Sequence, residues 1–518
     1  MNAAIQPQVN REPAFADAAS CRRWLAMQPL ANPVQMQSAL YGQLRLLEQA
    51  TLSAKERLKI LETLRETLGF VQSECARRFI GRALPLLEEE RAAFDANRAL
   101  WGATYDAYRQ CLHAFADGDS SLQDLAGRAA RRALAVLASE QFESHQARYE
   151  SDTWFWQRLH AIFATAERAG AADKRLCGIY ALPLLMHAAS PFTLSQRQMQ
   201  LLQRWLPRLA LKVSVSDKAP WSDHPPLAVG LDSGRPAALS GSGKNLRWLD
   251  VSSLARSVKR RLVALQRGQM PAALELGEGC SAAECEVVLR LLYTRCCKGQ
   301  PERATPRQDC AKSCEVFVGV AAIHDRLSAQ GLRPPVGRSK LSAKQLQSIA
   351  LFGHACVQDN MAPPRESIAA VERWDIADES RDGLRLVRPA SLARTRLESG
   401  SLLAIRRDDA ESMIIGFVRW VMIRTDAKLH VGVTTLPGIP EPAAVRMQAR
   451  GTGDSAYEQG LLLPEVEVLG LRATVLVPAN WFQEGAVLEL RGVRPSRVHL
   501  TRLSQRGVGF DRAEYLAL

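Results

Sequence analysis

Residues 373–387 read Arg-Trp-Asp-Ile-Ala-Asp-Glu-Ser-Arg-Asp-Gly-Leu-Arg-Leu-Val, and this stretch decides how the C-terminal part of the chain folds. Arg373 to Ala377 and Leu384 to Val387 both look like short strands. Between them, Asp378-Glu-Ser-Arg-Asp-Gly383 is rich in Asp, Ser and Gly, which favour turns because they tolerate or stabilise turn backbone conformations. The stretch therefore predicts two strands joined by a polar turn.

Further strands are predicted on both sides of this turn. Cys314 to Ile323 places Val316, Val318 and Val320 on one face, as an alternating strand does. Strands are also predicted in the β-rich segments 402–405, 413–423 and 428–436. Several short strands with turns between them predict an antiparallel barrel or sandwich. The chain from Val466 to Leu518 continues in strands, which predicts either a larger barrel or a second small β-domain.

The first two hundred residues have a different period. Asn32-Pro33 and Ser53-Ala-Lys-Glu56 are typical helix starts, since Asn and Ser cap helices and Pro suits the first turn. After Ser53, five apolar residues recur on one helical face, namely Leu58, Leu61, Leu64, Leu68 and Val71. Comparable amphipathic stretches follow, so we expect an all-α bundle or irregular superhelix.

These patterns predict a multidomain α+β protein. Its N-terminal all-α region precedes a C-terminal antiparallel β-barrel with a helical insertion and a β-rich tail. The predicted domains are a flexible leader (1–20), the helical region (21–212), a linker with short strands and a helical pair (213–298), the barrel (299–445, with its insertion at 324–370) and the C-terminal segment (446–518).

Two short motifs stand where helices give way to strands. Arg303-Ala-Thr-Pro-Arg307 precedes the first predicted strand, and Asp378, Ser380 and Gly383 form an Asp-x-Ser-x-x-Gly turn farther along. The arginine spacing carries little weight alone, because it also occurs at 128–132, 256–260 and 502–506. The Asp-x-Ser-x-x-Gly pattern occurs once. The placement of both motifs around the first strand gives the pair its value.

This arrangement resembles the PilZ domain, a β-barrel receptor for cyclic di-GMP. The signature of that family is an arginine pair before the first strand and a [DN]xSxxG turn on the barrel. Gly416-Phe-Val-Arg-Trp420 and His430-Val-Gly-Val433 look like later strands of the same domain. The resemblance covers roughly residues 300–440. It implies that Arg303, Arg307, Asp378, Ser380 and Gly383 bind cyclic di-GMP.

The residue chemistry suits that ligand independently. Guanidinium groups bind phosphate, or guanine O6 and N7, in bidentate fashion. A carboxylate such as Asp378 accepts from the guanine N1 and N2 edge, while the Ser380 hydroxyl donates or accepts. Gly383 permits close backbone approach and positive φ. Because 71 positions separate Arg307 from Asp378, we expect the insertion to fold out of the way, and the charged Arg381 and Asp382 to pair with each other or perturb the site.

We therefore predict a receptor without catalytic activity. Cyclic di-GMP would bind at the barrel, no cofactor would be needed, and an unidentified protein partner would contact the helical region. By family analogy, such a protein regulates motility, pili or exopolysaccharide. Two alternatives stay open, a non-binding PilZ-like scaffold and a basic nucleic-acid-binding protein.

Enzyme signatures are missing from the sequence. It contains no HExxH, GxSxG, GGDEF or EAL pattern and no dinucleotide-binding glycine fingerprint. Gly241-Ser-Gly-Lys244 is not a phosphate loop, because Ala238 and Asn245 replace the required Gly and hydroxyl residue. The cysteines at 280, 285, 296, 297, 310 and 314 lack the paired short spacing of zinc ligands, which favours buried free thiols over a metal site.

Charge and hydropathy limit the partners and the location. A formal charge of +13 favours anionic partners without selecting one. The low aromatic content, 6%, and the absence of an RNA-recognition pattern do not favour nucleic acid. No secretory signal and no spanning segment are readable, since the apolar run from Leu176 to Ala189 is short and contains Pro183. We expect a cytoplasmic protein.

Overall fold

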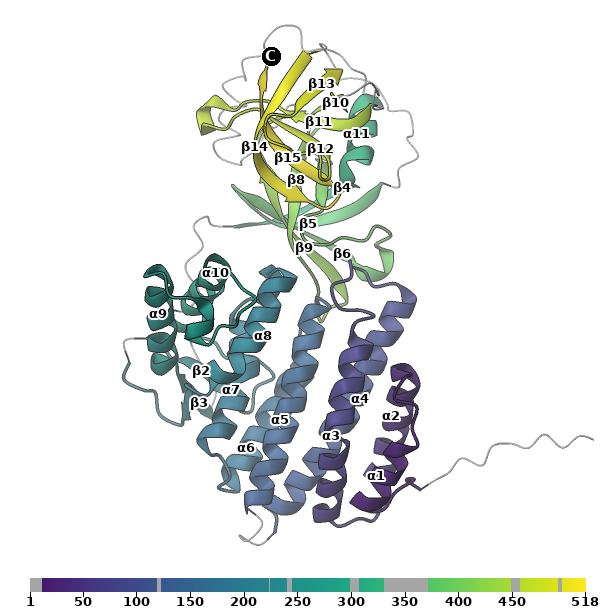
Figure 1. The fold of residues 1–518 in the computed structure, drawn as a ribbon, viewed down its shortest axis with the longest axis vertical. Helices are drawn as coiled ribbons and strands as arrows, with labels where there is room; N and C mark the ends of the chain where they lie inside the picture. Colours follow the sequence, from purple (N-terminus) through teal and green to yellow (C-terminus); the bar gives the residue numbers. More distant parts are fainter. Residues whose placement is uncertain are drawn as a thin grey trace, which may run out of the picture. The chain divides into compact units, whose positions relative to one another are not determined.

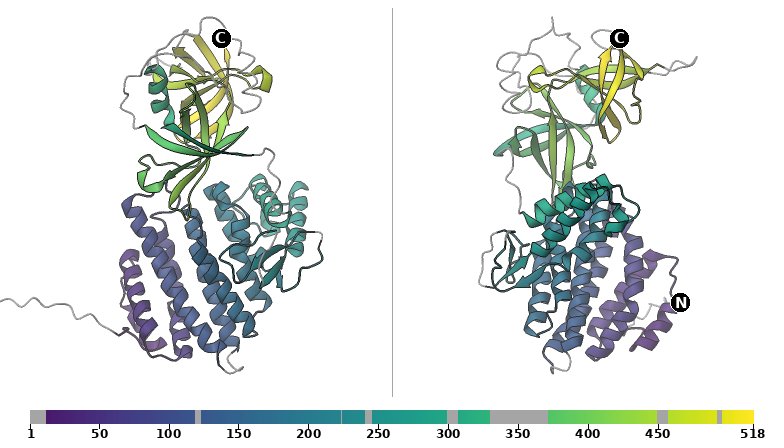
Figure 2. Two further views of the ribbon diagram at one scale, coloured as in Figure 1. Left: turned by 180° about the vertical axis from the view of Figure 1, so that it is seen from behind. Right: turned by 60° about the vertical axis from the view of Figure 1, so that its left-hand side comes forward.

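A computed structural model describes residues 12–118, 123–222, 224–239, 245–298, 307–329, 371–448, 457–491 and 496–518. The chain forms two compact units (Figures 1 and 2). Unit 1 comprises Met1–Arg82 and Leu86–Glu302, and unit 2 comprises Ala83–Pro85 and Arg303–Leu518. The N-terminal region is helical and the C-terminal part is β-rich, which confirms the predicted multidomain α+β class.

Unit 1 is built around a series of long helices. In chain order these are α1 (Ala18–Ala26), α2 (Pro33–Gln49), α3 (Ala54–Ala76), α4 (Glu88–Ala116), α5 (Gln123–Gln146), α6 (Thr153–Arg168), α7 (Lys174–Ala188) and α8 (Gln196–Ala210). The predicted caps are present, because Asn32 and Ser53 each accept a backbone hydrogen bond at the start of α2 and α3. Within the range predicted as a leader, the Phe15 side chain is buried and α1 begins at Ala18.

The range that the sequence predicts as a linker, 213–298, packs against these helices. It contains β1 (Ser214–Ser216), β2 (Leu227–Gly230) and β3 (Leu246–Asp250), in sheet order β1-β3-β2, followed by α9 (Ser252–Gln266), α10 (Ala282–Leu292) and a π-helical turn at Tyr293–Cys297. Leu249, Val258 and Leu289 are buried in the same apolar core as the long helices. Their burial makes this range an integral part of unit 1.

Unit 2 begins with a closed antiparallel barrel, as the sequence predicts. Its strands are β4 (Gln308–Val318), β5 (Glu372–Ser380), β6 (Gly383–Pro389), β7 (Leu402–Arg407), β8 (Met413–Ile423) and β9 (Lys428–Leu436), in the order β4-β5-β6-β9-β8-β7. Ile376, Leu386 and Val431 are fully buried and alternate with outward-facing residues. This alternation fixes which side chains reach the outer face.

A second closed barrel follows, so the β-rich tail is a separate small barrel instead of an extension of the first. Its strands are β10 (Glu441–Met447), β11 (Glu458–Leu463), β12 (Thr474–Pro478), β13 (Val487–Arg491), β14 (Ser496–Gly507) and β15 (Phe510–Ala517), in the order β10-β11-β12-β15-β14-β13. Val445, Val475 and Leu500 lie in its core. Because β10 starts at Glu441, the predicted boundary at 445 falls inside this strand.

The predicted strand over Cys314 to Ile323 is wrong in its second half. β4 ends at Val318, Gly319 adopts a positive φ of 85°, and α11 (Gly319–Ala329) follows, so His324 lies on a helix. Val320, Ile323 and Leu327 share the helical period and pack into a core shared by both barrels. Most of the predicted insertion, residues 330–370, lies outside the described residues.

No helix in the described ranges combines the length and apolar character required to cross a membrane.

Candidate ligand-binding site

Asp378 lies on the outer face of the first barrel because of a β-bulge. Ile376 pairs with Leu386 across β5 and β6, whereas Asp378 pairs with Arg385, so Ala377 is an extra residue in β5. Leu386 is buried inside the barrel, and its neighbour Arg385 points to the opposite side. Without the bulge, Asp378 would share the inward face of Ile376, since alternate strand residues lie on one face. The bulge therefore turns the carboxylate outward.

Two arginines hold the Asp378 carboxylate. Arg307 Nη1 donates to Oδ1 at 2.5 Å, and Arg385 Nε donates to Oδ2 at 2.5 Å. Asp378 is only 6% exposed, whereas the two arginine side chains are about a quarter exposed. The structure thus brings Arg307 and Asp378 together across 71 positions of sequence. Arg307, Asp378 and Arg385 form one cluster, which joins the two motifs and which we call the Asp378 site.

The polar turn is a tight hairpin closed by Ser380. Ser380 pairs with Gly383, and its Oγ donates to the Gly383 carbonyl oxygen at 3.2 Å. Arg381 and Asp382 occupy the two turn positions and are exposed. Among the described residues, no ion pair links Arg381 to Asp382, so the expected pairing of these two residues is not observed. Arg303, the other predicted arginine, lies outside the described residues.

Gly383 is required for a reason other than the predicted positive φ. Its φ is not in the left-handed region, and it lies in the β6 ladder opposite Thr434. A Cβ at this position would lie 2.3 Å from the Val433 carbonyl oxygen of β9. The glycine therefore allows β9 to approach β6 closely.

A second bulge brings an aromatic ring to the same outer face. Val418 pairs with Val433, but Trp420 pairs with Gly432, so Arg419 is the extra residue in β8. Gly432 also pairs with Arg385, which places Asp378, Arg385, Gly432 and Trp420 in one row across four strands. A Cβ on Gly432 would lie 2.1 Å from Trp420 Nε1, so the indole lies against this glycine.

Arg385 and Trp420 share the outer face of Asp378, and the sequence patterns do not predict either of them there. Both lie on predicted strands, but strand alternation alone cannot show that two bulges bring them onto the face of Asp378. The signal that was available is Gly432, a glycine inside a strand, which often marks a close approach of another group.

Two neighbouring titratable groups are already committed to other contacts. Burial alone would lower the pKa of Arg407, but Glu379 and Asp409 raise it, and Arg407 Nη1 bonds Glu379 Oε1 at 3.0 Å. Burial lowers the pKa of His430 despite Asp426, 3.3 Å from its Nε2. His430 is therefore neutral at pH 7.

The six cysteines of the predicted cluster are divided between the two units. Cys280, Cys285, Cys296 and Cys297 belong to unit 1, whereas Cys310 and Cys314 lie on β4 of unit 2. Burial raises the pKa of Cys285, Cys297 and Cys314 to about 12, so these thiols stay protonated at neutral pH. Within the described ranges, no three His, Cys, Asp or Glu residues are placed to hold a metal ion.

The Asp378 site and the neighbouring Trp420 together present two guanidinium groups, a carboxylate and an indole on the outside of the barrel. Guanidinium groups bind phosphates and base edges, carboxylates accept from base N–H groups, and aromatic rings stack on bases. The side chains of this face therefore have the chemistry to contact a nucleotide. The helical unit 1, the first barrel and the Asp378 site together indicate a class of β-barrel binding proteins with an α-helical N-terminal unit.

Comparison with known proteins agrees with this class. Residues 19–220 match the family described as the N-terminal domain of the cyclic-di-GMP receptor FimW, and residues 443–518 match the FimW C-terminal β-barrel domain. The second match coincides with the second barrel. The cyclic-di-GMP receptor FimW of Pseudomonas aeruginosa (strain PAO1) is 22% identical to this chain, over 97% of the chain and 91% of the relative. The predicted resemblance to cyclic di-GMP receptors is thereby confirmed.

Proposed function

We propose that this protein is a receptor for cyclic di-GMP that binds the dinucleotide at the Asp378 site. The observation that carries the proposal is the contact between Arg307 and Asp378, which joins the two halves of the predicted signature in one cluster. The similarity to the FimW receptor, whose name states this ligand, supports the same conclusion.

In the proposed complex, Asp378 accepts hydrogen bonds from the N1 and N2 edge of a guanine. Arg307 leaves the carboxylate and binds a phosphate or the guanine O6 and N7 atoms, since its side chain is partly exposed and lies directly before β4. Arg385 keeps the carboxylate oriented. Trp420 offers a ring face for stacking at the other end of the row. Arg303, Ser380 and Gly383 complete the proposed site.

The proposed role is that of an adaptor without catalytic activity. Arg303 and Arg307 precede the first strand of the barrel, so their contact with a ligand would change the segment that leads from unit 1. Unit 1 would then present or withdraw a surface for a protein partner in the cytoplasm. A role in motility, pilus or exopolysaccharide control follows from family analogy alone.

The experiment that tests this function is calorimetric titration of the full chain with cyclic di-GMP and, separately, with cyclic di-AMP. Adenine lacks the N2 amino group and the N1 proton, so it cannot donate the pair of hydrogen bonds that the guanine N1 and N2 edge offers to Asp378. We expect binding of cyclic di-GMP and at least about tenfold weaker binding of cyclic di-AMP, a difference of about 1.4 kcal/mol.

The same experiment separates the alternatives. If neither dinucleotide gave heat on titration, the barrel would not bind these ligands. The contacts of Arg307 and Arg385 with Asp378 would then have a structural role alone. Equal affinity for both dinucleotides would contradict the guanine-specific role of Asp378. A nucleic-acid-binding protein would instead retain DNA or RNA with steep salt dependence, unaffected by Arg307→Ala.

A further inference from the structure

A groove in unit 1 lies between three helices and has no part in the Asp378 site. Its volume is about 590 Å³, within the range of typical ligand-binding pockets. It is lined by residues of α1, α3 and α5, namely Ala18, Arg22, Lys55, Leu58, Lys59, Glu62, Thr63, Leu125 and Arg128. We call it the α1–α3–α5 groove.

The rim of the α1–α3–α5 groove is cationic. Arg22, Lys55, Lys59 and Arg128 are exposed and come from three different helices. Lys59 Nζ forms an ion pair with Glu56 at 3.0 Å. Within the described part of the chain, the other three cations have no ion-pair partner. Their charges are therefore available to an anionic partner.

Among the described residues that line the groove, Glu62 supplies the one carboxylate, and its charge is balanced by an arginine. Arg132 Nε and Nη2 donate to the two Glu62 oxygens at 2.8 and 2.7 Å. Burial alone would raise the pKa of Glu62, but Arg132 and the Tyr108 hydroxyl lower it, so Glu62 stays ionised and paired. The two arginines of the 128–132 spacing thus have separate roles. Arg132 binds Glu62, and Arg128 extends to the rim.

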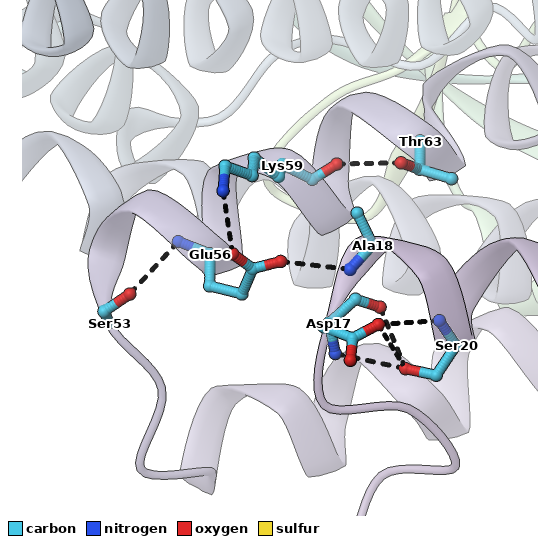
Figure 3. Close-up of polar contacts among 7 residues, drawn as sticks. All are labelled: Asp17, Ala18, Ser20, Ser53, Glu56, Lys59 and Thr63. Carbon is cyan, nitrogen blue, oxygen red and sulfur yellow. Dashed lines mark hydrogen bonds and ion pairs between the residues drawn. The ribbon is translucent and has the colours of Figure 1, made fainter.

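The wall formed by α1 and α3 is held by local hydrogen bonds, which Figure 3 shows. Glu56 Oε1 accepts from the Ala18 backbone N–H at 3.1 Å, which ties the start of α1 to α3. Ser53 Oγ caps α3 through the Glu56 N–H, and Asp17 with Ser20 forms a capping box on α1. A groove with fixed walls loses less conformational entropy when it binds a partner.

Between the cations, the floor of the groove is apolar. Leu58 is 3% exposed, and Leu125 and Ala18 are partly exposed beside it. An apolar floor inside a cationic rim fits an amphipathic segment whose apolar side chains enter the groove while its carboxylates face the rim. A phosphate backbone would gain nothing from the leucines, and a flat bilayer surface would not enter a groove between helices. We propose that this groove is the docking site for an acidic amphipathic segment of a partner protein.

The test uses a labelled peptide with glutamates on one helical face and leucines on the other, titrated against the full-length chain by fluorescence anisotropy. We expect binding to the wild type, and at least about tenfold weaker binding to the double variant Lys55→Glu/Arg128→Glu. The matched control Arg65→Glu/Lys212→Glu makes the same change in net charge at exposed positions outside the groove. We expect it to stay within about twofold of wild type. Circular dichroism checks that both variants are folded.

Three results would overturn the proposal. They are no binding to the wild type, an equal loss in the control variant, or equal binding of a peptide in which every glutamate is replaced by glutamine. Duplex DNA and anionic phospholipid vesicles are titrated in parallel. If Lys55→Glu/Arg128→Glu lost binding to one of these and not to the peptide, the partner would belong to that class and the proposed peptide docking would be wrong. Because the test contains no cyclic di-GMP, its outcome is independent of the proposed receptor function.

Discussion

Replacing Gly383 with alanine separates a role in barrel packing from a role in ligand binding. The added methyl carbon would lie 2.3 Å from the Val433 carbonyl oxygen, whereas ordinary contacts begin near 3.4 Å. The strand β9 must therefore move by about 1 Å, and the obstacle is backbone that cannot rotate away. We expect Gly383→Ala to lower the free energy of unfolding by about 2 kcal/mol in the absence of ligand, within the range of overpacked sites.

Differential scanning calorimetry of the full chain measures this effect. A loss of about 2 kcal/mol lowers Tm by roughly 4–8 °C for a unit of this size. The control is Gly69→Ala on α3, where a Cβ would meet nothing within 4 Å. Alanine is a better helix former there, so we expect about 1 kcal/mol of stabilisation. An unchanged Tm for Gly383→Ala, with a loss of cyclic di-GMP binding, would refute the packing argument.

Three further predictions concern single side chains. Asp378→Asn removes the negative charge that Arg307 and Arg385 both contact. We expect urea denaturation to show that the free energy of unfolding falls by about 1–2 kcal/mol, and an unchanged denaturation midpoint would contradict this. Trp420→Ala should weaken cyclic di-GMP binding about tenfold in calorimetry, and unaltered affinity would exclude stacking. Burial raises the pKa of Glu143 to about 8, so the folded state binds its proton more tightly and stability falls as pH rises toward 8. Glu143→Gln should reduce this dependence of Tm on pH. Plots of Tm against pH that run parallel for wild type and variant would refute the raised pKa of Glu143.

The barrel and its polar turn follow from the sequence because their signals are local. Residues 373–387 show a strand, a run of turn residues and a second strand, and β5 and β6 have this form. Helix starts at Asn32 and Ser53 depend on side chains within a few positions, and both caps form. The residues that make these contacts are only a few positions apart in the chain, so one sequence is enough to predict them.

The orientation of the site residues is not local in this sense. The bulges at Ala377 and Arg419 depend on the register of the neighbouring strands, and simple alternation places Asp378 on the inner face. Val316, Val318 and Val320 alternate across the Gly319 junction, and this alternation is why the sequence predicts a strand there. The helical spacing of Val320, Ile323 and Leu327 competes with that alternation, and packing against both barrels selects the helix.

The α1–α3–α5 groove likewise cannot be predicted from the sequence alone. The Arg128 to Arg132 spacing looks like an ordinary solvated helix face in the sequence. Only the contact of Arg132 with Glu62, 70 positions away, separates a paired arginine from one at the rim of a groove. Such a distinction requires the packing of α5 against α3.

The most direct test of the receptor assignment is titration of the wild type and of Arg307→Ala with cyclic di-GMP. Arg373→Ala is the matched control, because Arg373 is an exposed arginine of the same barrel outside the Asp378 row. Arg303→Ala tests the other arginine of the signature. We predict binding by the wild type and by Arg373→Ala, and loss of binding by at least about tenfold in Arg307→Ala. Equal affinity of wild type and Arg307→Ala, or no binding by the wild type, would contradict a cyclic di-GMP site at Asp378.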